Sequence, residues 1–184
     1  MRLYRFRDIY VAFTLLKGFN SEYLDDVAAL LDSLSGIVKP AEVQLFDADR
    51  VVDEEHVEAA IVNAVLSYNS PLRVARSLKV EFLLKLAATD QISEALKRVG
   101  LSSSTRRVAV CIFGSDVEHL LKSCDNVAKK LKGEEADFSD VNSRLDELMQ
   151  TYDIKAGELE NVQAESTPDA LKKLLIQRMA TSRL

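Results

Sequence analysis

The chain has 184 residues, of which 47% are hydrophobic, and its 24 lysines and arginines against 29 acidic residues give a formal net charge of −5. This length suits one soluble domain with a sizeable core, and the acidic balance argues against an indiscriminate, histone-like nucleic-acid binder. No apolar run approaches the roughly 20 residues of a membrane-spanning helix, and the N-terminus lacks the small-residue cleavage site of a signal peptide. We therefore expect a cytoplasmic protein with no membrane partner.

The first third of the chain alternates between strand and helix patterns. Residues 9–16 form an apolar run rich in β-formers, which predicts a buried strand with residues 2–6 as its hairpin partner. An apolar stripe after Asn20 predicts a helix that ends at Gly36, and residues 43–46 predict a short strand. Asp53 is expected to cap a second helix that ends before Pro71.

The remaining elements follow the same alternation. Hydrophobic residues alternate with polar ones over residues 79–86, which predicts a strand with one buried face. Asp90 is expected to cap a short helix, and residues 108–113 are expected to form a central strand followed by a helix that ends at Gly133. The sequence predicts an α+β fold, a single domain over residues 1–184 with a mixed, mostly antiparallel central sheet flanked by helices and a helical C-terminal part over about 139–184.

Residues 73–107 are the one basic stretch of this acidic chain. They hold eight lysines and arginines against three acids, whereas the segments before and after them are negative. A local basic surface indicates contact with a polyanion at one place. Arg73, Arg76 and Lys79 follow closely after Tyr68, so phosphate-binding charge lies near an aromatic ring. The alternative is that these cations only solvate a strand end and a helix C-terminus.

Catalytic motifs are absent from the sequence. It has no glycine-rich nucleotide loop and no G-x-S-x-G elbow, and His56 and His119 occupy solvent-like helix positions without metal-ligand spacing. The acids between Asp47 and Glu58 suggest an alternative function, a small metal-dependent enzyme holding a divalent cation. The simpler interpretation is a solvated loop with negative charge at a helix N-terminus. We therefore predict no catalytic residues, no metal and no cofactor.

Two neighbouring motifs resemble a known family. Arg76-Ser77-Leu78 followed by Glu81 and a run of leucines, and then Gln91-Ile92-x-Glu94-Ala95-Leu96, are similar to the small non-catalytic subunit of the KEOPS (EKC) complex, in the family that includes the PRPK-binding protein. The similarity is that of an archaeal-like member, although this chain has Asp90 where archaeal members usually have arginine. It extends back through His56 and Tyr68 and forward into residues 108–113.

The resemblance implies a function that composition does not. Members of this family bind the kinase/ATPase subunit of the complex, reach the rest of the complex through it, and hold the 3′ CCA end of tRNA during threonylcarbamoylation of the adenosine next to the anticodon. On this basis the tRNA-binding residues are expected to be Tyr68, Arg73, Arg76, Lys79, Gln91 and Ile92.

The last helix carries the residues expected to bind the kinase. Its apolar arc is wider than one core-facing stripe requires, and it consists of Leu171, Leu174, Leu175, Ile176 and Met179. The alternative is that the whole arc packs on the sheet.

Overall fold

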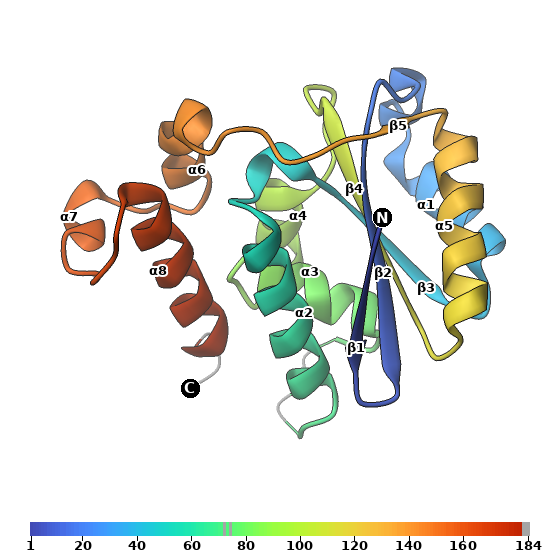
Figure 1. The fold of residues 1–184 in the computed structure, drawn as a ribbon, viewed down its shortest axis with the longest axis horizontal. Helices are drawn as coiled ribbons and strands as arrows, with labels where there is room; N and C mark the ends of the chain where they lie inside the picture. Colours follow the sequence, from blue (N-terminus) through green and yellow to red (C-terminus); the bar gives the residue numbers. More distant parts are fainter. Residues whose placement is uncertain (72, 74, 182–184) are drawn as a thin grey trace. The chain divides into compact units, whose positions relative to one another are not determined.

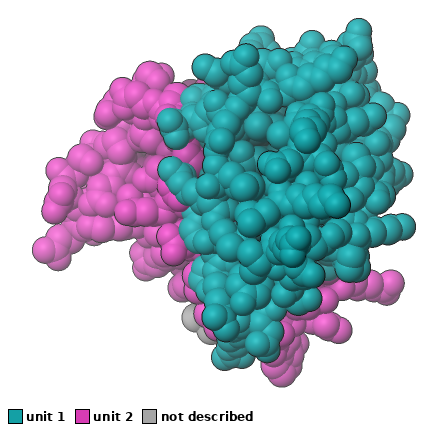
Figure 2. All heavy atoms as spheres, turned by 45° about the vertical axis from the view of Figure 1, so that its right-hand side comes forward, with its two compact units in different colours: residues 1–48, 100–137 teal, residues 49–99, 138–184 magenta. Residues whose placement is uncertain are grey.

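The computed structural model describes residues 1–71, 73 and 75–181, and it divides into two compact units (Figure 2). Unit 1 comprises residues 1–48 and 100–137, and unit 2 comprises residues 49–99 and 138–184. The C-terminal helical part therefore belongs with residues 49–99 and is not a separate appendage. The organisation of residues 1–184 as a single domain stays a prediction.

Unit 1 holds the β-sheet, whose strands run in the order β1 (Arg2–Phe6), β2 (Ile9–Lys17), β4 (Arg107–Gly114) and β3 (Glu42–Asp47). The short strand β5 (Glu134–Glu135) pairs with the end of β2. All the described pairings are antiparallel. Residues on both faces of β2 and β4 are buried, which explains why these strands read as continuous apolar runs and not as alternating ones.

Two helices of unit 1, α1 (Val27–Val38) and α5 (Val117–Leu131), cover one face of the sheet (Figure 1). Their apolar stripes meet the residues of β4 and its neighbours that point to this face, and together they form one buried cluster. Helix α1 is preceded by the short 3₁₀ turn η1 (Ser21–Leu24), which Asn20 caps, and α1 itself is capped by Asp26. Gly36 lies inside this helix, so the expected end at Gly36 was wrong by two residues.

Unit 2 is built from helices. After the turn η2 (Ala48–Arg50), α2 (Glu54–Tyr68) packs against both α3 (Leu78–Leu86) and α8 (Thr167–Thr181), and α3 packs against α4 (Ile92–Val99). The turn η3 (Asn142–Arg144) leads into α6 (Leu145–Thr151), and α7 (Ala156–Leu159) lies against α8 (Figure 1). Asp53 caps α2 as expected, because its carboxylate accepts the His56 backbone N–H.

The prediction of an α+β fold with a mostly antiparallel sheet flanked by helices is confirmed, but the sheet is not mixed, because every described strand pairing is antiparallel. The strand predicted over residues 79–86 was wrong, because Leu78–Leu86 is the helix α3. Every residue from Glu81 to Leu86 is buried, so an alternating pattern did not mark one buried face here. Among the described residues, no helix is both long enough and apolar enough to cross a membrane.

Candidate functional site

The structure brings together two of the residues predicted to contact RNA. Tyr68 is the last residue of α2, and the guanidinium carbon of Arg73 lies 5.6 Å from the centre of the Tyr68 ring. Arg73 is exposed, and its backbone N–H donates to the Ser70 carbonyl (3.3 Å), which closes the turn after the helix. A half-buried tyrosine beside an exposed arginine offers an aromatic ring and a positive charge at the same place.

The loop that leads into α3 is held from the inside by a buried carboxylate. Glu81 is fully buried, and its carboxylate accepts the backbone N–H of Ala75 at 3.0 Å. This contact fixes the path of the chain next to Arg76, whose side chain is exposed. Lys79 lies in the first turn of α3 and is half-buried. Glu81 therefore positions the loop that carries Arg73 and Arg76, which we call the basic loop.

Gln91 and Ile92 lie at the start of α4. The Gln91 carbonyl accepts the first helical hydrogen bond, from Ala95 N–H at 2.9 Å, so the cap position falls on Gln91 and not on the predicted Asp90. Ile92 is 50% exposed and Leu96, one turn later, is 51% exposed. Gln91 and Ile92 belong to unit 2 with Arg73, and among the described residues no hydrogen bond or ion pair joins either of them to Arg73.

The apolar arc of α8 divides into buried and partly exposed residues. Leu171, Leu175 and Met179 are completely buried and account for the packing of α8 within the core of unit 2. Leu174 and Ile176 are only half-buried. Of the five residues expected to bind the kinase, these two therefore retain surface that another protein can contact.

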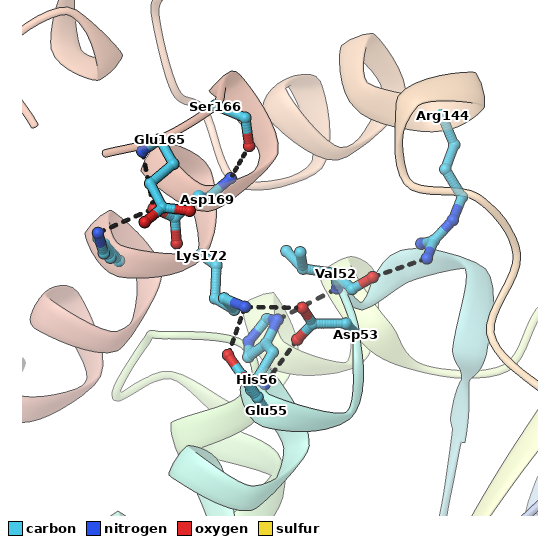
Figure 3. A network of polar contacts seen from close by, with 10 residues as sticks. Val52, Asp53, Glu55, His56, Arg144, Glu165, Ser166, Asp169 and Lys172 are labelled. Carbon is cyan, nitrogen blue, oxygen red and sulfur yellow. Dashed lines mark hydrogen bonds and ion pairs between the residues drawn. The ribbon is translucent and has the colours of Figure 1, made fainter. Parts of the chain in front are cut away.

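A buried histidine lies at the centre of a polar network in unit 2 (Figure 3). His56 is completely buried, which corrects the solvent-like position expected for it. Its Nδ1 accepts the Val52 backbone N–H at 3.3 Å, so its Nε2 carries the proton and donates to the Leu86 carbonyl at 3.1 Å. Burial lowers the pKa of His56 from 6.5 to about 4. The ring is neutral near pH 7 and holds α2 to the end of α3.

Arg144 binds the backbone just before α2. Its guanidinium donates to the carbonyl oxygens of Asp49, Val51 and Val52 at 2.6–2.8 Å. Tyr152, which follows α6, donates from its hydroxyl to the Arg50 carbonyl at 2.9 Å, and burial raises the pKa of this hydroxyl. Residues of the C-terminal segment thus supply hydrogen-bond donors to the backbone carbonyls of residues 49–52.

Acids of the 47–58 run have structural partners in the folded chain. Asp47 is buried and accepts the Thr105 hydroxyl at 2.7 Å, whereas Asp53 and Glu55 both pair with Lys172 of α8. Burial lowers the pKa of Lys172, but its hydrogen bonds to Glu55 and Asp53 outweigh that effect and raise the pKa overall. Among the described residues, no group of three or more histidine, cysteine, aspartate or glutamate side chains is placed to hold a metal ion. The arrangement does not favour the metal-dependent alternative.

Two comparisons with known proteins bear on this arrangement. The family model described as kinase binding protein CGI-121 matches residues 23–183, which is most of the chain. The chain belongs to this family. The chain is also similar to the EKC/KEOPS complex subunit TPRKB of Danio rerio, with 30% identity over 114 aligned residues. That match covers 62% of this chain and 62% of the relative.

Membership in the CGI-121 family agrees with the similarity seen in the two motifs around Glu81 and Gln91. The sequence did not reveal the roles of Arg144 and Tyr152, because an arginine between two short helices and a tyrosine after one carry no distinctive spacing. His56 was part of the resemblance, and its position three residues after the capping Asp53 was the available signal for a structural role.

Proposed function

We propose that this protein is a non-catalytic subunit of a KEOPS complex that binds the complex's kinase/ATPase subunit and the 3′ CCA end of tRNA. Through these contacts it supports threonylcarbamoylation of the tRNA adenosine next to the anticodon. The observation that carries the proposal is the match of the kinase-binding CGI-121 family to residues 23–183. The Danio rerio relative, itself named as an EKC/KEOPS complex subunit, supports the same assignment.

The tRNA part of the proposal rests on the basic loop of unit 2. Single-stranded nucleic acids bind where an aromatic ring can stack on a base and nearby cations can contact phosphates. Tyr68 with Arg73 over its ring provides the first feature, and the exposed Arg76 provides the second. Lys79 and the start of α4, with Gln91 and the exposed Ile92, extend the proposed surface.

A binding assay with two forms of tRNA tests this surface. We expect intact tRNA to bind more tightly than tRNA lacking its CCA end, and the affinity to fall with salt. Tyr68→Ala should weaken binding by about five- to a hundredfold if a base stacks on this ring. Arg76→Met should reduce the salt slope by about 0.7–0.9, the loss of one phosphate contact.

The matched control is Arg106→Met, which removes the same charge from an exposed position in unit 1. Equal binding of intact and trimmed tRNA would refute the role of the CCA end. An equal effect of Arg106→Met and Arg76→Met would show that only the overall charge of the protein matters.

The kinase part of the proposal concerns the partly exposed side of α8. Leu174 and Ile176 lie on this helix and are only partly buried, whereas their neighbours Leu171 and Leu175 pack inside unit 2. Because buried residues cannot meet a partner without unfolding the helix, the two half-buried residues are the part of the predicted set that we propose for the contact.

Size-exclusion chromatography with light scattering tests the kinase contact. The protein and the kinase subunit from the same source should form a 1:1 complex, and Leu174→Asp with Ile176→Asp should abolish it. Leu66→Asp is the control, because it places the same charge on an apolar residue of α2 that is 57% exposed and lies outside the proposed contact. Circular dichroism checks that all variants are folded. The absence of any complex at tens of micromolar would refute the assignment as a kinase-binding subunit.

A further inference from the structure

Unit 2 contains a surface cavity that the proposed tRNA and kinase contacts do not use. It has a volume of about 500 Å³ and lies between α6, α7 and the first turn of α8 (Figure 1). Its lining is mainly apolar, with side chains that include Leu145, Met149, Leu159 and Val162. Ligand pockets in proteins measure roughly 300–1,000 Å³, so this cavity has room for one or two large apolar side chains.

The opening of this cavity is acidic. Asp146 and Glu160 belong to its lining, and both are exposed. Within the described part of the chain, neither carboxylate takes part in a salt bridge. Residues 145–170, which include the cavity lining, contain seven acids and one lysine. Of the residues that the structure describes, no lysine, arginine or histidine lines the cavity. An apolar hollow with unneutralised carboxylates at its edge is complementary to an apolar side chain flanked by cations.

The first turn of α8 does not make the cavity an anion site. The Ser166 hydroxyl accepts the Asp169 backbone N–H at 3.3 Å, and the Asp169 carboxylate accepts the Glu165 N–H at 3.1 Å (Figure 3). Backbone donors at this end of the helix are thus engaged by the chain's own side chains. The Asp169 carboxylate is paired with Lys173, so the negative charge at the cavity comes from Asp146 and Glu160, and it disfavours a phosphate or carboxylate ligand.

We propose that this cavity binds a segment of a partner protein that inserts a large apolar side chain, such as leucine, and places lysines or arginines against Asp146 and Glu160. The apolar side chain supplies the affinity because it leaves water on entering the cavity. The cations orient the segment and exclude acidic sequences. This surface is formed by α6, α7 and the start of α8, and it is independent of the tRNA and kinase proposals.

The test uses synthetic peptides as probes. A fluorescein-labelled peptide of leucines and lysines is titrated with the full chain, and its binding is followed by fluorescence anisotropy. A second peptide has glutamine in place of each leucine and the same charge, and a third has glutamate in place of each lysine. We expect the leucine–lysine peptide to bind at least about tenfold more tightly than either, because burial of one leucine side chain is worth that factor or more.

Three variants place the peptide on the cavity. Ala164→Phe fills it from its half-exposed lining and should weaken binding at least about tenfold. Asp146→Lys with Glu160→Lys should weaken binding several-fold and remove most of its salt dependence. The control is Glu118→Lys with Asp125→Lys, two exposed positions on α5. It changes the net charge of the protein by the same amount as the cavity double variant and should leave peptide binding as in the wild type.

Each alternative result would overturn the proposal. Equal affinity for the leucine and glutamine peptides would mean that charge alone drives binding, and unchanged binding to Ala164→Phe would place the peptide elsewhere. Analytical ultracentrifugation tests whether a second copy of this chain occupies the cavity. A wild-type dimer that Ala164→Phe dissociates would assign the cavity to a second copy of this chain and not to a partner protein. Circular dichroism of each variant separates loss of binding from loss of fold.

Discussion

The buried His56 makes stability depend on pH in a way that one substitution isolates. Burial lowers the pKa of this ring from 6.5 to about 4, so the unfolded chain binds a proton more readily than the folded protein does. The contribution of His56 to stability is complete above about pH 6.5 and is lost as the pH falls towards about 4. One pKa unit corresponds to about 1.4 kcal/mol, so the loss is about 2 kcal/mol between pH 7 and pH 5 and about 3 kcal/mol by pH 4.

Urea unfolding of the wild type and of His56→Gln at several pH values between about 5 and 8 measures this difference. The substitution lowers stability at neutral pH, because the Val52 N–H loses its acceptor and the Leu86 carbonyl loses one of its two donors, the other being the Tyr152 hydroxyl. The informative quantity is the slope: the wild type should lose about 2 kcal/mol more than the variant between pH 7 and pH 5. His119 and the carboxylates are common to both proteins and cancel. Parallel slopes would refute a buried, neutral His56.

Four further substitutions test contacts elsewhere in the fold by denaturant unfolding. Arg144→Met should cost about 3 kcal/mol, because several buried carbonyls lose their donor at once; an effect below about 1 kcal/mol would mean that water replaces the guanidinium. Gly133→Ala should cost about 1–3 kcal/mol, because the added Cβ would lie 2.9 Å from the Leu16 Cβ, and an unchanged midpoint would contradict that crowding. Lys172→Met should cost about 1 kcal/mol and Lys173→Met less than about 0.5 kcal/mol, because Lys172 is 17% exposed and pairs with two carboxylates whereas Lys173 is 48% exposed and pairs with one.

The fold class was predictable because its strongest signals are long. Residues 9–16 and 108–113 are continuous apolar runs that fit strands buried on both faces, and the structure has β2 and β4 there. The wrong strand prediction over Leu78–Leu86 also comes from burial on nearly every side, but in a segment that is short. A short segment buried on nearly every side contains no polar face from which its period can be read, so alternation among Lys79, Glu81 and Lys85 imitated a strand. Buried Glu81 and Lys85 are tertiary features that no local pattern encodes.

The candidate site was predictable in part, for a related reason. The nearness of Tyr68 and Arg73 follows from a short turn, so sequence separation alone indicated it. The division of α8 into inner and outer residues depends on which helix packs against it. Because that neighbour, α2, lies more than a hundred residues earlier in the chain, the sequence showed a wide apolar arc without showing which part stays exposed.

The division of the chain into two units has a consequence for the order of folding during synthesis. Every strand and helix of unit 1 has left the ribosome once residue 137 has emerged, so this unit can complete its sheet at that stage. Unit 2 cannot, because Arg144, Tyr152 and Lys172 supply the partners of residues 49–55. Helices α2, α3 and α4 must therefore wait with their apolar faces incompletely covered until α8 arrives. This nascent intermediate is the stage at which we expect chaperone binding and aggregation to compete with folding.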